Sequence, residues 1–193
     1  MRISCAVLAS LFVLVPLAQA KDEPVVPGQR FVGPILNIRA PNSGGWKLLE
    51  SSGGAVVFAR RGTSSGESFI AAVLRFPLPQ AQTGDEFEVL VKHEVEKDAP
   101  PDRFKNIDAT FEMSNVRGYV CVLYRATTED TKAKTSLFSR SQLVLQVQAL
   151  YCRPPNMEKA GFAATYSHRG PTKVDDFDAQ ASDFIEGIQV PHG

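Results

Sequence analysis

Two stretches of alternating residues decide the fold of this chain, YVCVLYRA at residues 119–126 and LVLQVQALYC at residues 143–152. Successive side chains of a β-strand point to opposite faces, so every second residue lies on the same side. The even-numbered residues from Val120 to Ala126 share one apolar face, and so do the odd-numbered residues from Leu143 to Tyr151. We therefore predict two consecutive strands that pair as an antiparallel hairpin and pack an apolar face on a core.

Shorter elements flank this hairpin on both sides. Short apolar runs between turn residues predict strands at 46–50, 55–60, 68–76, 109–114 and 162–168. Apolar residues at helical spacing predict one helix capped by Thr83 or Asp85, and a second capped by Asp176 or Asp178.

This order of elements predicts an α+β fold. We expect one domain at residues 46–193, with a mostly antiparallel sheet of about six or seven strands flanked by two main helices. Residues 21–45 are rich in proline and glycine. They are expected to form an extended N-terminal arm, in which Phe31 to Ile38 form either a short strand or an element laid on the core.

The first twenty residues have the pattern of a cleavable signal peptide. Arg2 precedes an apolar run, Pro16 ends it, and Ala18-Gln19-Ala20 supplies the small residues that a signal peptidase requires. The run is shorter than the ~20 apolar residues that span a bilayer, which disfavours the alternative of a membrane anchor. We expect a periplasmic or secreted protein with no integral membrane segment after cleavage.

The hairpin register and the export signal together predict a disulfide between Cys121 and Cys152. In an antiparallel pair, directly opposed residues have numbers with a constant sum, and the two apolar faces coincide only when that sum is odd. The two cysteine numbers have an odd sum, so this register allows them to face each other. Cleavage of the signal would remove Cys5 and leave two of the three cysteines. Exported proteins with two cysteines typically form one disulfide; the alternative is two free, buried thiols.

Composition and motifs exclude several classes of function. The chain has 21 basic and 21 acidic residues, whereas a nucleic-acid-binding protein carries a basic excess, so no nucleic-acid partner is expected. The segment 62–66 matches the G-x-S-x-G nucleophile elbow, but strand-like residues on both sides predict a hairpin loop. The histidines His93, His168 and His192 lack paired ligand spacing, so we expect no metal and no cofactor.

The best nucleus for a catalytic site is Ser167-His168-Arg169, at the end of an expected strand. Serine and histidine together are the residue types of nucleophilic catalysis. A strand that simply runs into a loop is the favoured interpretation, so no catalytic residue is predicted. Some of the aromatic residues of the chain are candidates to line a groove between a helix and the sheet.

The element order also resembles that of a known family. The chain has a Gly45-Trp46 entry, a strand ending at Arg75-Phe76-Pro77, a helix, four strands and a closing helix near Phe184-Ile185. This order of elements is similar to that of the PsbP/Mog1-like superfamily over roughly residues 35–190. That superfamily includes many small exported bacterial proteins. The resemblance implies a binding or accessory role and assigns no site residue.

The sequence thus favours an exported, non-catalytic accessory or binding module of the bacterial envelope. Its expected partner is an unknown protein or a small apolar ligand. The alternative is a small secreted, hydrolase-like enzyme with a site assembled around Ser167, His168 and Arg169.

Cleavage of the signal is directly measurable. The intact mass of the protein from its native host should correspond to a chain that begins at Lys21, because Ala18-Gln19-Ala20 precedes that residue. A mature chain that still carries Met1 would contradict both the predicted export and the argument that export supports the disulfide.

Overall fold

A computed structural model describes residues 23–33, 35–79, 83–134, 140–157 and 159–191. The signal segment 1–20 lies outside these residues. Within them, neither helix is long and apolar enough to span a membrane.

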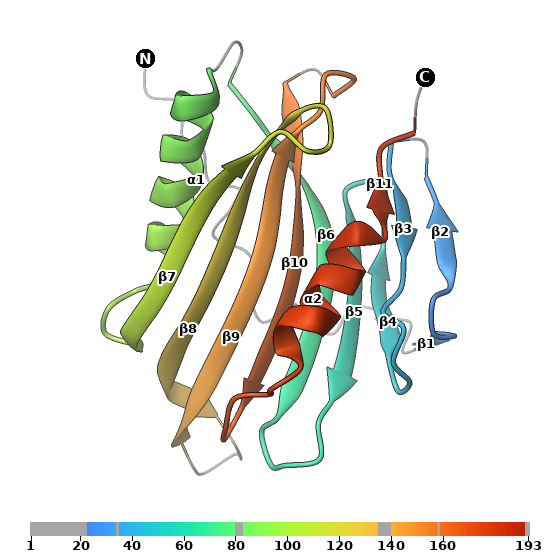
Figure 1. The fold of residues 1–193 in the computed structure, drawn as a ribbon. Helices are drawn as coiled ribbons and strands as arrows, with labels where there is room; N and C mark the ends of the chain where they lie inside the picture. Colours follow the sequence, from blue (N-terminus) through green and yellow to red (C-terminus); the bar gives the residue numbers. More distant parts are fainter. Residues whose placement is uncertain (1–22, 34, 80–82, 135–139, 158, 192–193) are drawn as a thin grey trace.

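The described residues form one large antiparallel sheet, one small sheet and two helices (Figure 1). The large sheet has eight strands in the order β1-β4-β5-β6-β10-β9-β8-β7, namely β1 (Glu23–Pro24), β4 (Lys47–Ser51), β5 (Ala55–Arg61), β6 (Ser68–Pro77), β7 (Phe104–Ser114), β8 (Val120–Lys134), β9 (Arg140–Arg153) and β10 (Ala160–Gly170). The small sheet has the order β11-β3-β2, with β2 (Arg30–Val32), β3 (Asn37–Arg39) and β11 (Ile188–Gln189). The helices are α1 (Gly84–Asp98) and α2 (Phe177–Glu186).

The mostly antiparallel α+β architecture is confirmed, but the main sheet has eight strands, where six or seven were expected. The additional strand is β1, which pairs with Lys47 and Leu48 at the edge of the sheet. It is two residues long and contains Pro24, so it has no detectable alternation. Proline is tolerated there because an edge strand leaves one side of its backbone unpaired.

The central hairpin is longer than the sequence indicated. Residues 127–142 were expected to form a polar connection, whereas β8 continues to Lys134 and β9 begins at Arg140. Polar residues continue the strand because β7 supplies partners for them. Thr128 donates a hydrogen bond to the Lys105 carbonyl at 2.8 Å, and Asp130 accepts two from Arg103.

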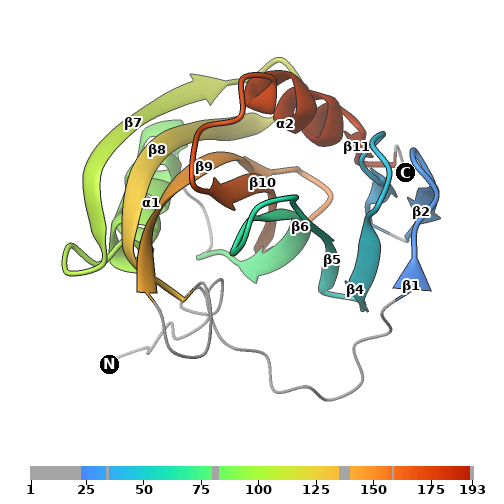
Figure 2. The same cartoon turned by 90° about the horizontal axis from the view of Figure 1, so that it is seen from below.

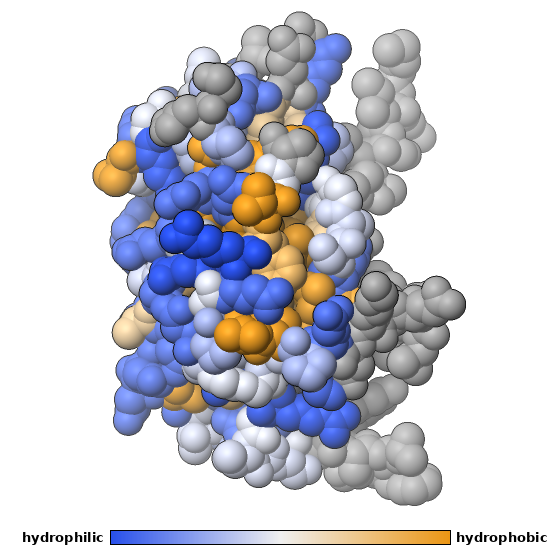
Figure 3. Space-filling view, turned by 90° about the vertical axis from the view of Figure 1, so that its right-hand side faces the viewer, coloured by the Kyte–Doolittle hydropathy of each residue, from blue (hydrophilic) through white to orange (hydrophobic). Residues whose placement is uncertain are grey.

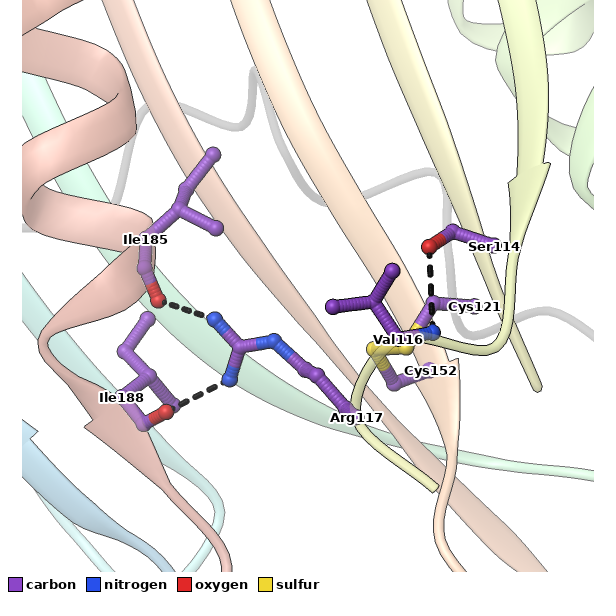
Figure 4. Close-up of a disulfide and its surroundings, with 7 residues drawn as sticks. All are labelled: Ser114, Val116, Arg117, Cys121, Cys152, Ile185 and Ile188. Atoms are coloured by element: carbon purple, nitrogen blue, oxygen red, sulfur yellow. Dashed lines mark hydrogen bonds between the residues drawn. A yellow bond between two sulfur atoms is a disulfide. The ribbon is translucent and has the colours of Figure 1, made fainter. Parts of the chain in front are cut away.

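The predicted disulfide register is confirmed. Cys121 lies directly opposite Cys152 in the β8–β9 ladder, with their Cα atoms 4.2 Å apart and the two sulfurs bonded (Figure 4). Next to it, Arg117 in the turn between β7 and β8 donates hydrogen bonds to the carbonyls of Ile185 and Ile188 at 2.7 and 2.6 Å. One of these carbonyls lies in the last turn of α2 and the other in β11, so Arg117 ties the β7–β8 turn to both elements.

The two helices cover opposite faces of a curved sheet (Figure 2). Phe184 and Ala181 of α2 pack in one core with Tyr166 and Phe58. On the other face, α1 places Phe87 and Val91 in a second core, which contains Phe76, Val122 and Tyr151. The helix α1 begins where the sequence indicated, because Thr83 and Glu86 form a reciprocal capping box.

The N-terminal arm packs on the first core. Val25 and Ile38 are buried in it. Arg39 donates a hydrogen bond to Asp183 of α2 at 2.9 Å, and Asn42 donates one to the same carboxylate at 2.8 Å. The arm is therefore anchored to α2 as well as to the edge of the sheet.

Reduction should lower the thermal stability of the folded protein. The cysteines are separated by 31 positions in the sequence, and a bridge that closes such a loop stabilises by about 3–4 kcal/mol in the chain-entropy model. We expect a reductant to lower the Tm by roughly 10 °C. The Tm of the double variant C121A/C152A should not respond to reductant, and an equal shift in both proteins would contradict this prediction.

Candidate binding cavity

A cavity of about 260 Å³ opens on the face of the main sheet that carries α1. We call it the α1-side cavity. The helix ends at Asp98, and Pro100-Pro101 prevents its continuation. Strands β8 and β9 continue past this end (Figure 1), so part of the sheet face is left without a covering helix. The cavity lies there, between the end of α1, the start of β7 and the sheet.

The floor of the α1-side cavity is built from rows of side chains on neighbouring strands. One row joins Ile70, Ser167, Val147 and Ala126, which are directly opposed across β6, β10, β9 and β8. The row on one side contains Ser68, Arg169, Leu145 and Thr128, and the row on the other contains Ala72, Thr165 and Tyr124. Val95, Asp98, Ala99, Phe104 and Ile107 form the walls.

Two tyrosine hydroxyls lie at the α1 end of the cavity. Neither Tyr124 nor Tyr151 forms a hydrogen bond with another described residue through its side chain. Burial raises the pKa of Tyr124 to about 12 and raises the pKa of Tyr151 as well. Both phenols are therefore neutral near pH 7 and keep a proton to donate. Burial, followed by the nearby Glu94, also raises the pKa of Asp98 at the same end.

A group of charged residues lies at the opposite end of the cavity. Asp130 is 1% exposed and receives a bidentate contact from Arg103, with distances of 3.0 and 2.7 Å. Nη1 of Arg169 is 3.9 Å from the same carboxylate. Two guanidinium groups therefore share one carboxylate, which leaves one positive charge in excess within this group.

The structure separates the three residues that formed the catalytic alternative. Ser167 and Arg169 line the α1-side cavity, whereas His168 points to the opposite face and is fully buried there. This separation follows from strand alternation, because all three residues lie within β10. The imidazole of His168 therefore does not lie beside Ser167.

His168 belongs to a buried polar contact with Glu67 and Gln146. Its Nε2 lies 3.1 Å from a Glu67 carboxylate oxygen, and its Nδ1 lies 3.3 Å from the Gln146 side-chain oxygen. The carboxylate only accepts hydrogen bonds, so Nε2 carries the proton. Burial lowers the pKa of His168, although the hydrogen bond to Glu67 acts in the opposite direction.

The G-x-S-x-G segment forms the loop between the paired strands β5 and β6, as predicted. It positions Glu67, which accepts a hydrogen bond from the Ser64 backbone at 2.9 Å. A Cβ at Gly62 would lie 2.2 Å from the Glu67 side chain, and one at Gly170 would lie 2.7 Å from Nε2 of His168. Both glycines are therefore required by the close approach of this buried pair.

The remaining histidines lie elsewhere. His93 is exposed on α1, and His192 lies outside the described residues. In the part of the chain that the structure describes, no group of three or more His, Cys, Asp or Glu residues is placed to hold a metal ion.

A second hollow of about 360 Å³ lies between the small sheet and the β4–β5 turn. Apolar side chains of Phe31, Ile35 and Leu36 line it, with Arg75 as its one charged lining residue among those described. Figure 3 shows apolar side chains gathered among polar ones on this side of the molecule. The α1-side cavity is the better candidate site, because several polar groups converge on it around an apolar floor.

Comparison with known proteins finds remote structural likeness without a family match. No family model matches the chain, and no curated protein does. Among solved structures, it is similar to a protein of Bacteroides thetaiotaomicron VPI-5482, with a TM-score of 0.47 and 12% identity over 86% of this chain and 50% of that one. The chain thus spans half the length of that protein. A likeness of this degree supports no inference about fold or function.

The protonation of His168 gives a prediction about stability and pH. Because burial lowers its pKa in the folded state, the unfolded chain binds the proton more readily. The free energy of unfolding should therefore fall as the pH drops below the ordinary histidine pKa of about 6.5. The pKa of Glu67 is also lowered, first by the Ser64 backbone hydrogen bond and then by His168, which adds a further loss in stronger acid.

The variant His168→Gln isolates this contribution. It should be less stable by about 1–3 kcal/mol at neutral pH, since Glu67 loses its buried partner. Its Tm should also vary less than that of the wild type from about pH 7.5 to about pH 5.5. A wild-type Tm that rises on acidification across this range would contradict the assignment.

Proposed function

We propose that this protein is an exported, non-catalytic binding module of the bacterial envelope that holds a small, mainly apolar ligand in the α1-side cavity. The observation that carries the proposal is the cavity itself, which places an apolar floor and several convergent polar groups on one sheet face. Its volume of about 260 Å³ is close to the lower end of the ~300–1,000 Å³ found for small-molecule sites.

The lining residues support a ligand with an apolar body. Ile70, Ala72, Leu145 and Val147 present only hydrocarbon to the cavity, and Phe104 closes one wall. A ligand that covers these side chains removes apolar surface from water, at about 25 cal/mol per Å². The hydroxyls of Tyr124 and Tyr151 then serve to orient it, because each has a proton to donate and no hydrogen-bond partner among the described residues.

The proposed localisation outside the cytoplasm rests on the sequence pattern of residues 1–20. The paired cysteines agree with an oxidising compartment, the periplasm or the exterior. The order of elements supports the proposed relation to PsbP/Mog1-like proteins, which also suits an accessory role. The enzyme alternative rests on Ser167, and no observation favours it, since His168 lies on the other face of the sheet.

A cavity-filling variant tests the proposal. The neutral fluorescent probe N-phenyl-1-naphthylamine should bind the mature protein with a stoichiometry of one. In Ala72→Phe, the new ring projects from the cavity floor and takes up space in the cavity, and we expect probe affinity to fall at least tenfold, the loss of about 1.4 kcal/mol.

Ala179→Phe makes the same change at an exposed position of α2 and should bind the probe as the wild type does. Thermal melts establish that both variants are folded. The proposal fails if the wild type binds no probe, or if a folded Ala72→Phe protein binds it with unchanged affinity.

A further inference from the structure

We propose that the ligand of the α1-side cavity is a single-chain amphiphile with a carboxylate head group, such as a medium-chain fatty acid, and that Arg169 binds this head group. The inference rests on the proposed function and adds the chemical class of the ligand. It is drawn from the charged groups at the two ends of the cavity.

The carboxylate of Asp130 is already occupied. Arg103 contacts both of its oxygens, through Nε at 3.0 Å and Nη2 at 2.7 Å. This bidentate arrangement is the strongest geometry available to a guanidinium and a carboxylate. Asp130 also accepts a hydrogen bond from the Lys132 backbone at 3.2 Å. Little of its capacity as an acceptor remains for a second guanidinium.

Within the described residues, the Arg169 guanidinium has only the longer of the two arginine contacts to Asp130. Its Nη1 is 3.9 Å from Asp130, beyond hydrogen-bond distance. Its Nε is buried and has no hydrogen-bond partner among the residues that the structure describes. A buried donor without an acceptor is energetically unfavourable, so an acceptor brought by a ligand removes this penalty. Because Arg169 lines the cavity, that acceptor can come from the bound molecule.

The charge at this end fits a monoanion. Arg103, Arg169 and Asp130 together carry one excess positive charge, and one carboxylate neutralises it. Lys132 and Asp102 form a separate ion pair nearby and neutralise each other. Glu67, the other acidic residue near this end of β10, contacts His168, which is buried on the opposite face.

The other end of the cavity disfavours an anion. Asp98 lies there with Tyr151, whose pKa is raised first by burial, then by Tyr124 and then by Asp98. The C-terminal end of α1 is at the same place, and the partial charge of a helix C-terminus is negative. The cavity is therefore electrostatically polarised, with its positive end at Arg169 and its negative end at Asp98.

The distance between the two ends requires an elongated ligand. Ala163 is directly opposite Tyr151 and precedes Arg169 by six residues on β10. At ~3.3 Å per residue, this is about 20 Å along the strand. Ile70, Ala72 and Val147 lie between, on the floor. A carboxylate at Arg169 with a hydrocarbon chain that covers this floor and ends short of the tyrosine hydroxyls matches the order of these surfaces.

Head-group recognition is tested by a matched pair of ligands. Calorimetric titration of the mature protein, at low salt and below the concentration at which the ligands aggregate, compares decanoate with decanol. The wild type should bind decanoate at least tenfold more tightly, since a hydrogen bond to a charged group contributes more than a neutral one. Arg169→Gln should lose this preference while its affinity for decanol stays unchanged.

Two further variants complete the test. Arg169→Lys keeps the charge without the planar fork and should retain part of the preference. Arg75→Gln removes an exposed arginine whose neighbour Phe76 faces the α1 side and should behave as the wild type. The ligand comparison in the wild type needs no variant to fold.

The outcomes separate the two proposals. If the wild type binds decanol and decanoate with equal affinity, or Arg169→Gln keeps the preference for decanoate, the head-group inference is wrong and the cavity still binds an apolar ligand. If neither ligand nor the neutral probe binds, the proposed function fails, and this inference fails with it.

Discussion

The alternation of side chains along β8, β9 and β10 is the constraint on which the rest of the structure depends. These strands lie in the interior of the sheet, and each has a covered surface on both sides. The position of a residue in the alternation therefore decides which core it enters. It places the Cys121–Cys152 bridge in the core under α2 and Tyr151 in the core under α1. It also places Ser167 and His168 on opposite faces of the sheet, so that Ser167 lines the cavity and His168 forms a structural contact.

Much of this arrangement could be predicted from local patterns. The register of β8 and β9, the opposition of the cysteines and the capping box at Thr83 all depend on short-range rules of parity and capping. The unpredicted parts depend on partners distant in the chain. Residues such as Thr128 and Asp130 look like a polar connection until they meet the Lys105 carbonyl of β7 and the guanidinium of Arg103, just before β7, which allow them to be buried in a strand.

The cavity was also beyond the reach of sequence patterns. An aromatic residue such as Tyr124 or Phe104 fits the same sequence pattern whether it fills a core or lines a cavity. Only the length of the element that covers the sheet distinguishes a core position from a cavity position. The same is true of Ser167-His168-Arg169. Residue type suggested a cluster, but the strand directs its neighbouring residues to opposite faces.

The length of α1 explains why a hollow exists on this face. With 15 residues, the helix extends about 22 Å at 1.5 Å per residue. The 14 residues of β9 extend about 46 Å. A helix that Pro100-Pro101 stops at this length covers roughly half of the strand. Beyond its end the sheet still presents Ile70, Leu145 and Val147 on the same face. Leu145 is buried nonetheless, but Ile70 and Val147 remain partly exposed, and apolar surface of this kind is characteristic of a site that another molecule covers.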